Sequence, residues 1–260
     1  MIRMLLTIVL ALSVCFSGLP AQEAAVPVQK QVEITFVGHA CFVITTSEGT
    51  DIVCDPTGVE GYSLPRDLEA DIVTVSHQHF DHNNVSAVGG DPIVLHGMVG
   101  ESHDGFGHEF VPVDSQFGDV HIHTVECHHF PPEESPIMNA IFVFAFDGIT
   151  VAHLGDIGVP LTAEQAGDVG PVDILMIPTG GKYTLELEEL DAQISQLSPK
   201  VVIPMHFATD VADFVPNTQE DFLKGKQHIM KIDGYTYRLN PERLPEQLTY
   251  VALEYYGQSD

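Results

Sequence analysis

The stretch "SHQHFDH", residues 76–82, places three histidines and one aspartate within six residues. Imidazole nitrogens and carboxylate oxygens are the ligands that zinc and similar divalent ions take in proteins. His77 and His79, two residues apart, can point toward one metal ion. Asp81 and His82 can reach a second ion beside it. This segment therefore predicts part of a site for two adjacent divalent ions.

One loop cannot complete two metal sites, so further ligands must come from other parts of the chain. Three segments place a ligand-type residue just after an apolar run, and these residues are the pair His128-His129, Asp156 and His206. Open α/β architectures gather their active sites at the carboxyl ends of strands. We therefore expect these residues to join the histidine-rich segment.

The elements that must position these residues can be read from the apolar pattern. Short runs rich in β-branched residues predict strands over residues 32–37, 41–46, 51–54, 71–75, 92–96, 120–127, 140–146, 149–154, 172–177, 201–205, 234–239 and 248–253. Helical spacing predicts a short helix capped by Thr162, one over 185–197 and one over 218–228. The predicted fold class is α/β, an αββα sandwich of two stacked mixed β-sheets with helices on the outer faces.

The N-terminus has the layout of a secretory signal peptide. Arg3 precedes an apolar run over 4–16, and small residues follow up to Ala21. The run is short for a membrane span. We expect a signal peptide over 1–21, a polar tether over 22–31 and a single domain over 32–260. The mature protein would then be periplasmic or secreted, without stable membrane insertion. A buried N-terminal helix and lipidation at Cys15 are the less favoured alternatives.

The charge of the chain limits its partners. It has 37 acidic and 10 basic residues, which gives a net charge of −27 at pH 7. Binding to a phosphate backbone needs clustered lysine and arginine, so nucleic acid is an unfavourable partner. Anionic membrane surfaces are disfavoured for the same reason. A small-molecule substrate is the expected partner, and the sequence leaves open whether the chain forms a homo-oligomer.

The cysteine count excludes a complete disulfide framework. After signal cleavage, Cys41, Cys54 and Cys127 remain, which is an odd number. A bridge between Cys41 and Cys54 across a predicted hairpin is one alternative. Two buried thiols are the favoured one.

The motifs together resemble the metallo-β-lactamase superfamily. They are "VGHACFVI", "CDPTG", "SHQHFDHNNV", "AHLGDIG", "IPTGGKYT" and "VVIPMHF", and the resemblance extends from about Val32 to Leu253. More narrowly, the chain is similar to the branch that contains the ascorbate-6-phosphate lactonases and many unassigned metal-dependent hydrolases.

The resemblance implies a ligand set. The first metal would take His77, His79 and His129, the second metal would take Asp81, His82 and His206, and Asp156 would bridge both. The interval of four residues after Val125 favours His129 over His128. The stretch "HHFPPEES" replaces the family's commoner single histidine followed by acidic and glycine-rich residues, so the third ligand and the adjacent pocket wall stay open.

The expected cofactor is a pair of divalent ions, with zinc as the default and manganese, iron or nickel as alternatives. A bound metal lowers the pKa of water to about 7, so a hydroxide that bridges the metals would be the nucleophile. Asp81 would orient it, and the Tyr183 hydroxyl would donate to the developing oxyanion. His39, Gly181 and Lys182 are the candidate substrate-binding residues, although a structural histidine, a helix-entry turn and an exposed lysine explain them equally well.

The function predicted from these observations is an exported binuclear metal-dependent hydrolase of a lactone, an ester or a related acyl or phosphoryl compound. One alternative is a periplasmic metallo-β-lactamase, but the subclass that shares the histidine motif lacks the bridging aspartate that Asp156 would supply. Another alternative is a non-catalytic metal-binding protein of the cell envelope. The sequence leaves the natural substrate and the metal used in the cell open.

Overall fold

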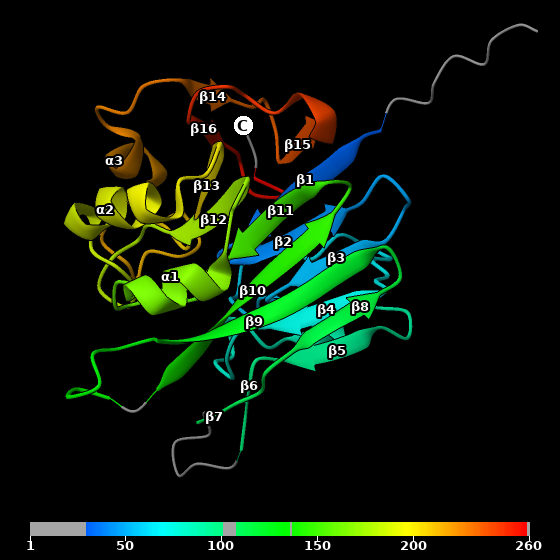
Figure 1. The fold of residues 1–260 in the computed structure, drawn as a ribbon, viewed down its shortest axis with the longest axis horizontal. Coiled ribbons are helices and arrows are strands. Elements are labelled where there is room, and N and C mark those ends of the chain that lie inside the picture. The colour runs from blue at the N-terminus through cyan, green and yellow to red at the C-terminus, as the bar shows by residue number, and fades with distance from the viewer. Residues whose placement is uncertain (1–29, 101–107, 136, 259–260) are drawn as a thin grey trace, which may run out of the picture.

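The computed structural model describes residues 30–100, 108–135 and 137–258. The predicted signal peptide and nearly all of the predicted tether lie outside the described residues, so both stay predictions. Within the described part, two large sheets lie face to face, and Figure 1 shows strands β2 to β4 (blue to cyan) behind strands β9 to β11 (green).

The first sheet has six strands in the order β15-β1-β2-β3-β4-β5. They are β1 (Val32–Gly38), β2 (Cys41–Thr45), β3 (Asp51–Cys54), β4 (Ile72–Val75), β5 (Ile93–His96) and β15 (Thr236–Leu239). The strands β1, β2 and β3 pair antiparallel, whereas β3, β4 and β5 pair parallel, so the sheet is mixed. All of β4 is buried, as expected for a parallel strand that is covered on both faces.

The second sheet has eight strands in the order β14-β16-β13-β12-β11-β10-β9-β8. They are β8 (Asp114–Phe117), β9 (Val120–His128), β10 (Met138–Phe146), β11 (Ile149–His153), β12 (Ile174–Pro178), β13 (Val201–Met205), β14 (Ile229–Lys231) and β16 (Thr249–Ala252). A separate pair consists of β6 (Met98–Val99) and β7 (Glu109–Phe110). The sequence pattern missed β6, β7, β8 and β14, because they are short and β8 and β14 are mostly exposed.

The main core fills the space between the two sheets. Strand alternation sends Phe142 and Phe144 of β10 inward, where they join Phe36 and Phe42 of the first sheet. The rings of Phe36 and Phe42 have centroids 5.0 Å apart. Burial of large aromatic side chains of this kind is the main source of stability in such a sandwich.

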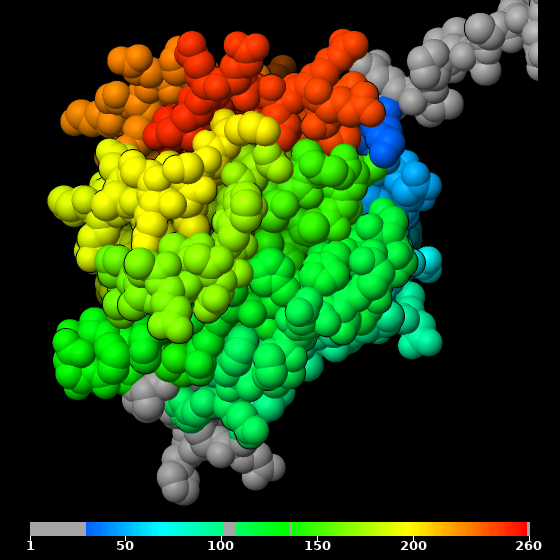
Figure 2. All heavy atoms as spheres, viewed as in Figure 1, coloured from blue at the N-terminus to red at the C-terminus, as the bar shows by residue number. Residues whose placement is uncertain are grey.

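The α-helices pack on the outer face of the second sheet. They are α1 (Ala163–Val169), α2 (Leu187–Leu197) and α3 (Gln219–Leu223), and all three contribute to one buried cluster with that sheet. The predicted cap is present, since the Thr162 side chain accepts a hydrogen bond from Gln165 N. Figure 2 shows the atoms of α1 and α2 as a continuous yellow-green to yellow surface beside the green strands. No helix in the described part of the chain is long and apolar enough to cross a membrane.

The outer face of the first sheet is covered differently from the αββα prediction. Its buried cluster, which includes Val43, Val53 and Val73, is packed against the segment 64–70 and the 3-10 helix η1 (Val85–Ala87). Among the described residues, no α-helix covers this face. A second 3-10 helix, η2 (Pro241–Arg243), lies near the C-terminus. The fold class of two stacked mixed sheets is nevertheless confirmed.

The cysteines 41, 54 and 127 are all free and buried. Phe42, not Cys41, is the partner of Cys54 in the β2–β3 ladder. Cys41 therefore lies in the outer cluster of the first sheet and Cys54 in the main core. The alternation of side chains across the sheet excludes the cross-strand bridge and leaves buried thiols.

Strand direction brings the ends of four strands to one edge of the second sheet. β9 and β11 are each antiparallel to β10, and β11, β12 and β13 are parallel, so all four end at the same edge. The end of β4 in the first sheet meets this edge, because Ala140 N donates to Ser76 O at 3.1 Å. The predicted ligand segments all follow these strands.

Candidate metal centre

Three imidazole nitrogens converge in the first of two groups of candidate metal ligands, called the ligand groups below, which consists of His77, His79, His129 and Asp156. His77 Nε2 lies 2.9 Å from His79 Nδ1, and His129 Nε2 lies 3.3 Å from the same atom. Two nitrogen ligands on a tetrahedral zinc ion lie about 3.3 Å apart, since each Zn–N bond is about 2.05 Å. The spacing of these nitrogens therefore fits a shared divalent ion.

The second ligand group consists of His39, Asp81, His82 and His206, whose ligand atoms lie within 4.8 Å of one another. His39 Nε2 donates to Asp81 Oδ2 at 3.0 Å, and the rings of His39 and His206 have centroids 3.9 Å apart. His39 is 1% exposed. The structure thus places this predicted substrate residue among the ligand side chains and away from the cavity surface.

Asp156 lies between the two groups. Its Oδ2 is 3.2 Å from His82 Nε2 and 3.2 Å from His206 Nε2 in the second group. In the first group, the same oxygen is 3.5 Å from His129 Nε2 and 3.8 Å from His77 Nε2. One carboxylate oxygen thus faces imidazoles of both groups, which is the position expected of a bridging ligand.

Two buried polar atoms of this cluster fit a cation. Among the described residues, Asp156 Oδ1 and His82 Nε2 are buried without a well-directed hydrogen bond, although His82 Nε2 lies 3.2 Å from Asp156 Oδ2. An unsatisfied buried polar group costs about 1–3 kcal/mol, so native structures rarely keep several in one place. Divalent ions bound by the imidazoles and the carboxylate would remove this cost at His82 and Asp156.

The protonation states of His77, His79, His129 and Asp156 suit metal binding, whereas His82 would have to release a proton, because Asp156 and Asp81 raise its pKa well above the usual value despite its burial. Burial and the neighbouring His129 lower the pKa of His79 to about 4, and burial lowers the pKa of His77 and of His129. These imidazoles are therefore neutral at pH 7. Burial alone would raise the pKa of Asp156, but His206 and His82 hold it well below its usual value. Neutral imidazole and ionised carboxylate are the forms that bind metal ions.

Asp55 is a site residue that sequence reasoning missed. Its Oδ2 accepts hydrogen bonds from His82 Nδ1 at 2.8 Å and from Ser76 Oγ at 2.6 Å. Ser76 Oγ in turn lies 2.9 Å from His77 Nδ1. The buried carboxylate thus orients one histidine of each ligand group. The sequence offered a pointer to this role in "CDPTG", because Asp55 directly follows an apolar run. Asp156 likewise follows an apolar run, with only Gly155 between.

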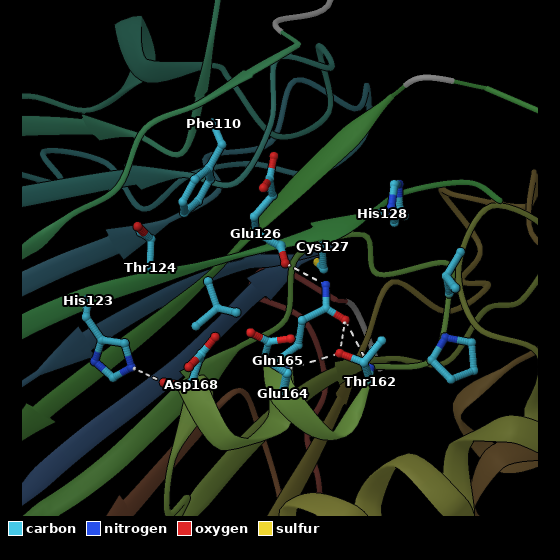
Figure 3. Close-up of a pocket in the computed structure, with 13 residues that line it drawn as sticks. Phe110, His123, Thr124, Glu126, Cys127, His128, Thr162, Glu164, Gln165 and Asp168 are labelled. Carbon is cyan, nitrogen blue, oxygen red and sulfur yellow. Dashed lines mark hydrogen bonds between the residues drawn. The ribbon is translucent and has the colours of Figure 1, made fainter. Parts of the chain in front are cut away.

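The structure separates the two adjacent histidines after β9. His129 joins the first ligand group, whereas His128 lines a groove of about 590 Å³ between β9 and α1. Figure 3 shows His128 at this groove, together with Glu164 and Gln165 of α1. Side chains of consecutive residues in an extended chain point to opposite faces, so only one of the pair can reach the ligand group.

Two glycines allow the ligand loops to pack closely. A Cβ atom on Gly158 would lie 1.8 Å from His129 O, and a Cβ atom on Gly180 would lie 2.2 Å from His206 O. Gly158 N also donates to His128 O at 3.0 Å. Any side chain at these positions would therefore displace the backbone of a ligand residue.

A cavity of about 480 Å³ opens beside both ligand groups, and Tyr183 is part of its wall. Lys182 and Gly181 do not line it. The Lys182 Nζ donates to Phe214 O at 3.2 Å, so the amine is held by a backbone carbonyl. Gly181 has a φ of 72°, and a Cβ there would lie 2.8 Å from Glu186 Oε2, which explains the glycine by local packing.

The family model of the beta-lactamase superfamily domain matches residues 33–206, which is more than half of the chain. The UPF0173 metal-dependent hydrolase of Thermococcus onnurineus is 28% identical over 197 residues, covering 68% of this chain and 85% of that protein. The UPF0173 metal-dependent hydrolase of Pelotomaculum thermopropionicum is 32% identical over 197 residues with the same coverage.

A solved structure from Thermotoga maritima, described as a Zn-dependent hydrolase of the metallo-β-lactamase superfamily, matches with a TM-score of 0.68 and 33% identity. The match covers 86% of this chain and 98% of that one. The sequence and structural comparisons thus agree with the clustered histidines and aspartates described above. The chain therefore belongs to the metallo-β-lactamase superfamily and is one of its metal-dependent hydrolases.

Proposed function

We propose that this hydrolase is binuclear, with one divalent ion in each ligand group and Asp156 shared between the two ions. The observation that carries the proposal is the position of Asp156 Oδ2, which lies within 3.8 Å of imidazole nitrogens from both groups. Zinc suits these nitrogen and oxygen ligands, and manganese, iron or nickel would also be accepted.

Two ions held in this way would supply Lewis acidity and an activated water near neutral pH. Two side chains that line the cavity, Asp81 and Tyr183, would act on the attacking water and on the developing oxyanion. Asp81 lines the cavity, and its hydrogen bond from His39 fixes the carboxylate, so we assign it the orientation of the attacking water and the uptake of its proton. Tyr183 lines the same cavity, and its hydroxyl would donate a hydrogen bond to the developing oxyanion.

The proposed substrate is a small lactone, ester or related acyl or phosphoryl compound, and the enzyme would be periplasmic or secreted. The signal-like N-terminus supports export, and the net charge of −27 disfavours nucleic acid as a partner. The narrower resemblance to the lactonase branch rests on the motifs alone and stays a prediction.

Metal analysis of zinc-loaded protein tests the proposal. We expect two zinc ions per chain, and we expect Asp156→Asn to lower this content to one or fewer and kcat/KM by at least about 100-fold, because the shared carboxylate contacts both groups. Asp168→Asn on the exposed face of α1 is the matched control and should leave both values unchanged.

The substrate screen that provides kcat/KM should contain lactones, aryl esters, phosphodiesters and nitrocefin. One zinc ion per wild-type chain would contradict the binuclear site. Nitrocefin turnover faster than that of every ester and lactone would instead support the β-lactamase alternative.

A further inference from the structure

The wall of the active-site cavity is apolar wherever it is not formed by the ligand groups. Four of its residues, His79, Asp81, His129 and His206, belong to those groups. The remaining lining residues are aromatic or aliphatic: Phe80, Phe130, Ile137, Tyr183 and Phe214. Once the ligand side chains are engaged with metal ions, a substrate would meet mainly hydrocarbon surface.

Phe80 marks the entrance of this cavity. It lies inside the metal-ligand motif, between His79 and Asp81, and its side chain is 71% exposed. A single exposed apolar side chain is common on protein surfaces, so its exposure alone assigns no role to Phe80. Its place in the cavity lining, between two residues of the ligand groups, puts its ring where a bound substrate would contact it.

Two other rings are held in fixed positions next to the ligands. Phe130 stacks on His129 with centroids 4.1 Å apart and an interplanar angle of 7°. Phe214 lies against the second group, with its centroid 5.6 Å from His39 and 6.4 Å from His206. An apolar group bound on these rings would therefore lie directly beside both ligand groups.

No lysine or arginine among the described residues lines this cavity. Lys182 is adjacent in sequence to Tyr183, which lines the cavity. Its Nζ lies 3.2 Å from Phe214 O and 4.5 Å from the centroid of the Tyr183 ring. A phosphate or carboxylate on the substrate would thus find no cation in the wall besides the metals. The chain's strong net negative charge adds to this disadvantage for anionic substrates.

We propose that the site hydrolyses neutral esters or lactones that carry an apolar acyl group, and that this group binds on the rings of Phe80, Phe130 and Phe214. The inference rests on the proposed hydrolase function and names its substrate class. Water adds its oxygen to the acyl carbon and the acyl–oxygen bond breaks. One proton of that water ends on the alcohol and the other is released from the carboxylic acid, so no oxidant or reductant is needed.

A homologous ester series tests the proposal on the zinc-loaded full chain. The probes are p-nitrophenyl acetate, p-nitrophenyl butyrate and p-nitrophenyl octanoate. The anionic substrates for comparison are p-nitrophenyl phosphate and bis(p-nitrophenyl) phosphate. We expect kcat/KM to rise at least about tenfold from acetate to octanoate, since each buried methylene favours binding by up to about fourfold. Both phosphate esters should be turned over at least about 100 times more slowly than the octanoate.

The variants Phe80→Ala and Phe214→Ala should each lower kcat/KM for the octanoate about five- to tenfold, and by less for the acetate, because they remove apolar wall. Met230→Ala on β14 is the matched control, because Met230 is a partly exposed apolar residue outside the cavity lining. It should leave the whole series unchanged.

Calorimetry gives a second measurement that does not depend on turnover. The ligands are the free carboxylate ions acetate, butyrate and octanoate, which are the acid products of the ester series. Their dissociation constants from the zinc-loaded protein should fall from acetate to octanoate, and free octanoate should bind more tightly than inorganic phosphate. Faster turnover of a phosphate ester, or rates and affinities that do not change with chain length, would overturn the apolar substrate class and leave a two-zinc hydrolase standing. Absence of turnover on every probe in protein with two zinc ions would overturn the proposed function, while octanoate binding would still decide the apolar preference.

Discussion

At the scale of single residues, the candidate site depends on a side chain outside the cavity lining. Asp55 is buried and accepts hydrogen bonds from His82 and Ser76. Metal-bound histidines commonly donate their second N–H to a carboxylate, which fixes the tautomer and the ring orientation. Asp55 therefore sets which nitrogen of His82 faces Asp156.

Replacing Asp55 with asparagine should weaken metal binding about 10- to 100-fold, because the amide keeps the shape but accepts the hydrogen bonds of His82 and Ser76 less well. Competition with a chromogenic zinc chelator measures the affinity. Asp91→Asn, at an exposed loop position, is the matched control and should match the wild type. An unchanged affinity in Asp55→Asn would show that the carboxylate does not orient a ligand.

At the scale of elements, the strands end where the ligands are needed, and close loop packing then fixes the ligand backbones. β9, β11 and β13 run in the same direction, so His129, Asp156 and His206 follow them at one edge of the sheet. The loop after β11 crosses the backbone of His129 at Gly158, where no side chain fits.

Gly158→Ala tests this loop packing. The added methyl group would lie 1.8 Å from His129 O, so the loop must shift, and we expect a loss of about 2 kcal/mol or more in the free energy of unfolding together with weaker zinc binding. Gly167→Ala in α1 is the control, since nothing lies within 4 Å of its Cβ position. Because alanine favours helix over glycine, the control should gain about 0.5–1 kcal/mol in urea unfolding. Equal stability of the two variants would contradict the close approach.

At the scale of the whole molecule, the candidate metal ligands come from both sheets. The loop after β4 in the first sheet carries His77, His79 and His82, whereas His129 and His206 follow strands of the second sheet. A metal ion in either ligand group would therefore bind both layers at once. Ligands that bind only the folded state raise its stability by mass action.

Removal of metal should consequently lower the stability of the whole domain. Excess zinc at about 1,000 times its Kd would contribute about 4 kcal/mol, which predicts a large fall in Tm when a chelator is added. Calorimetric scans of the zinc-loaded and chelated protein measure the difference. Asp156→Asn is the comparison variant, and its Tm should respond less to the chelator. A Tm that does not depend on zinc would contradict a site that links the sheets.

The sequence by itself determined the main strands, the fold class and the residue types of the site. Periodicity and strand ends are local features, so the runs before His77, His129, Asp156 and His206 could be recognised without coordinates. The resemblance to a known family added which of these residues would bind the first metal ion, the second metal ion or both. The family and the hydrolase class were confirmed by the comparisons, whereas the roles of individual residues stay predictions.

Only the tertiary structure decided which polar residues meet. It separated His129 from His128, brought His39 to Asp81, and placed Asp55 behind His82. It also showed that the cavity wall is apolar and that Lys182 is turned to a backbone carbonyl. These features depend on contacts between residues far apart in the chain. Such contacts are fixed by the packing of two sheets and leave no periodic signal in the sequence.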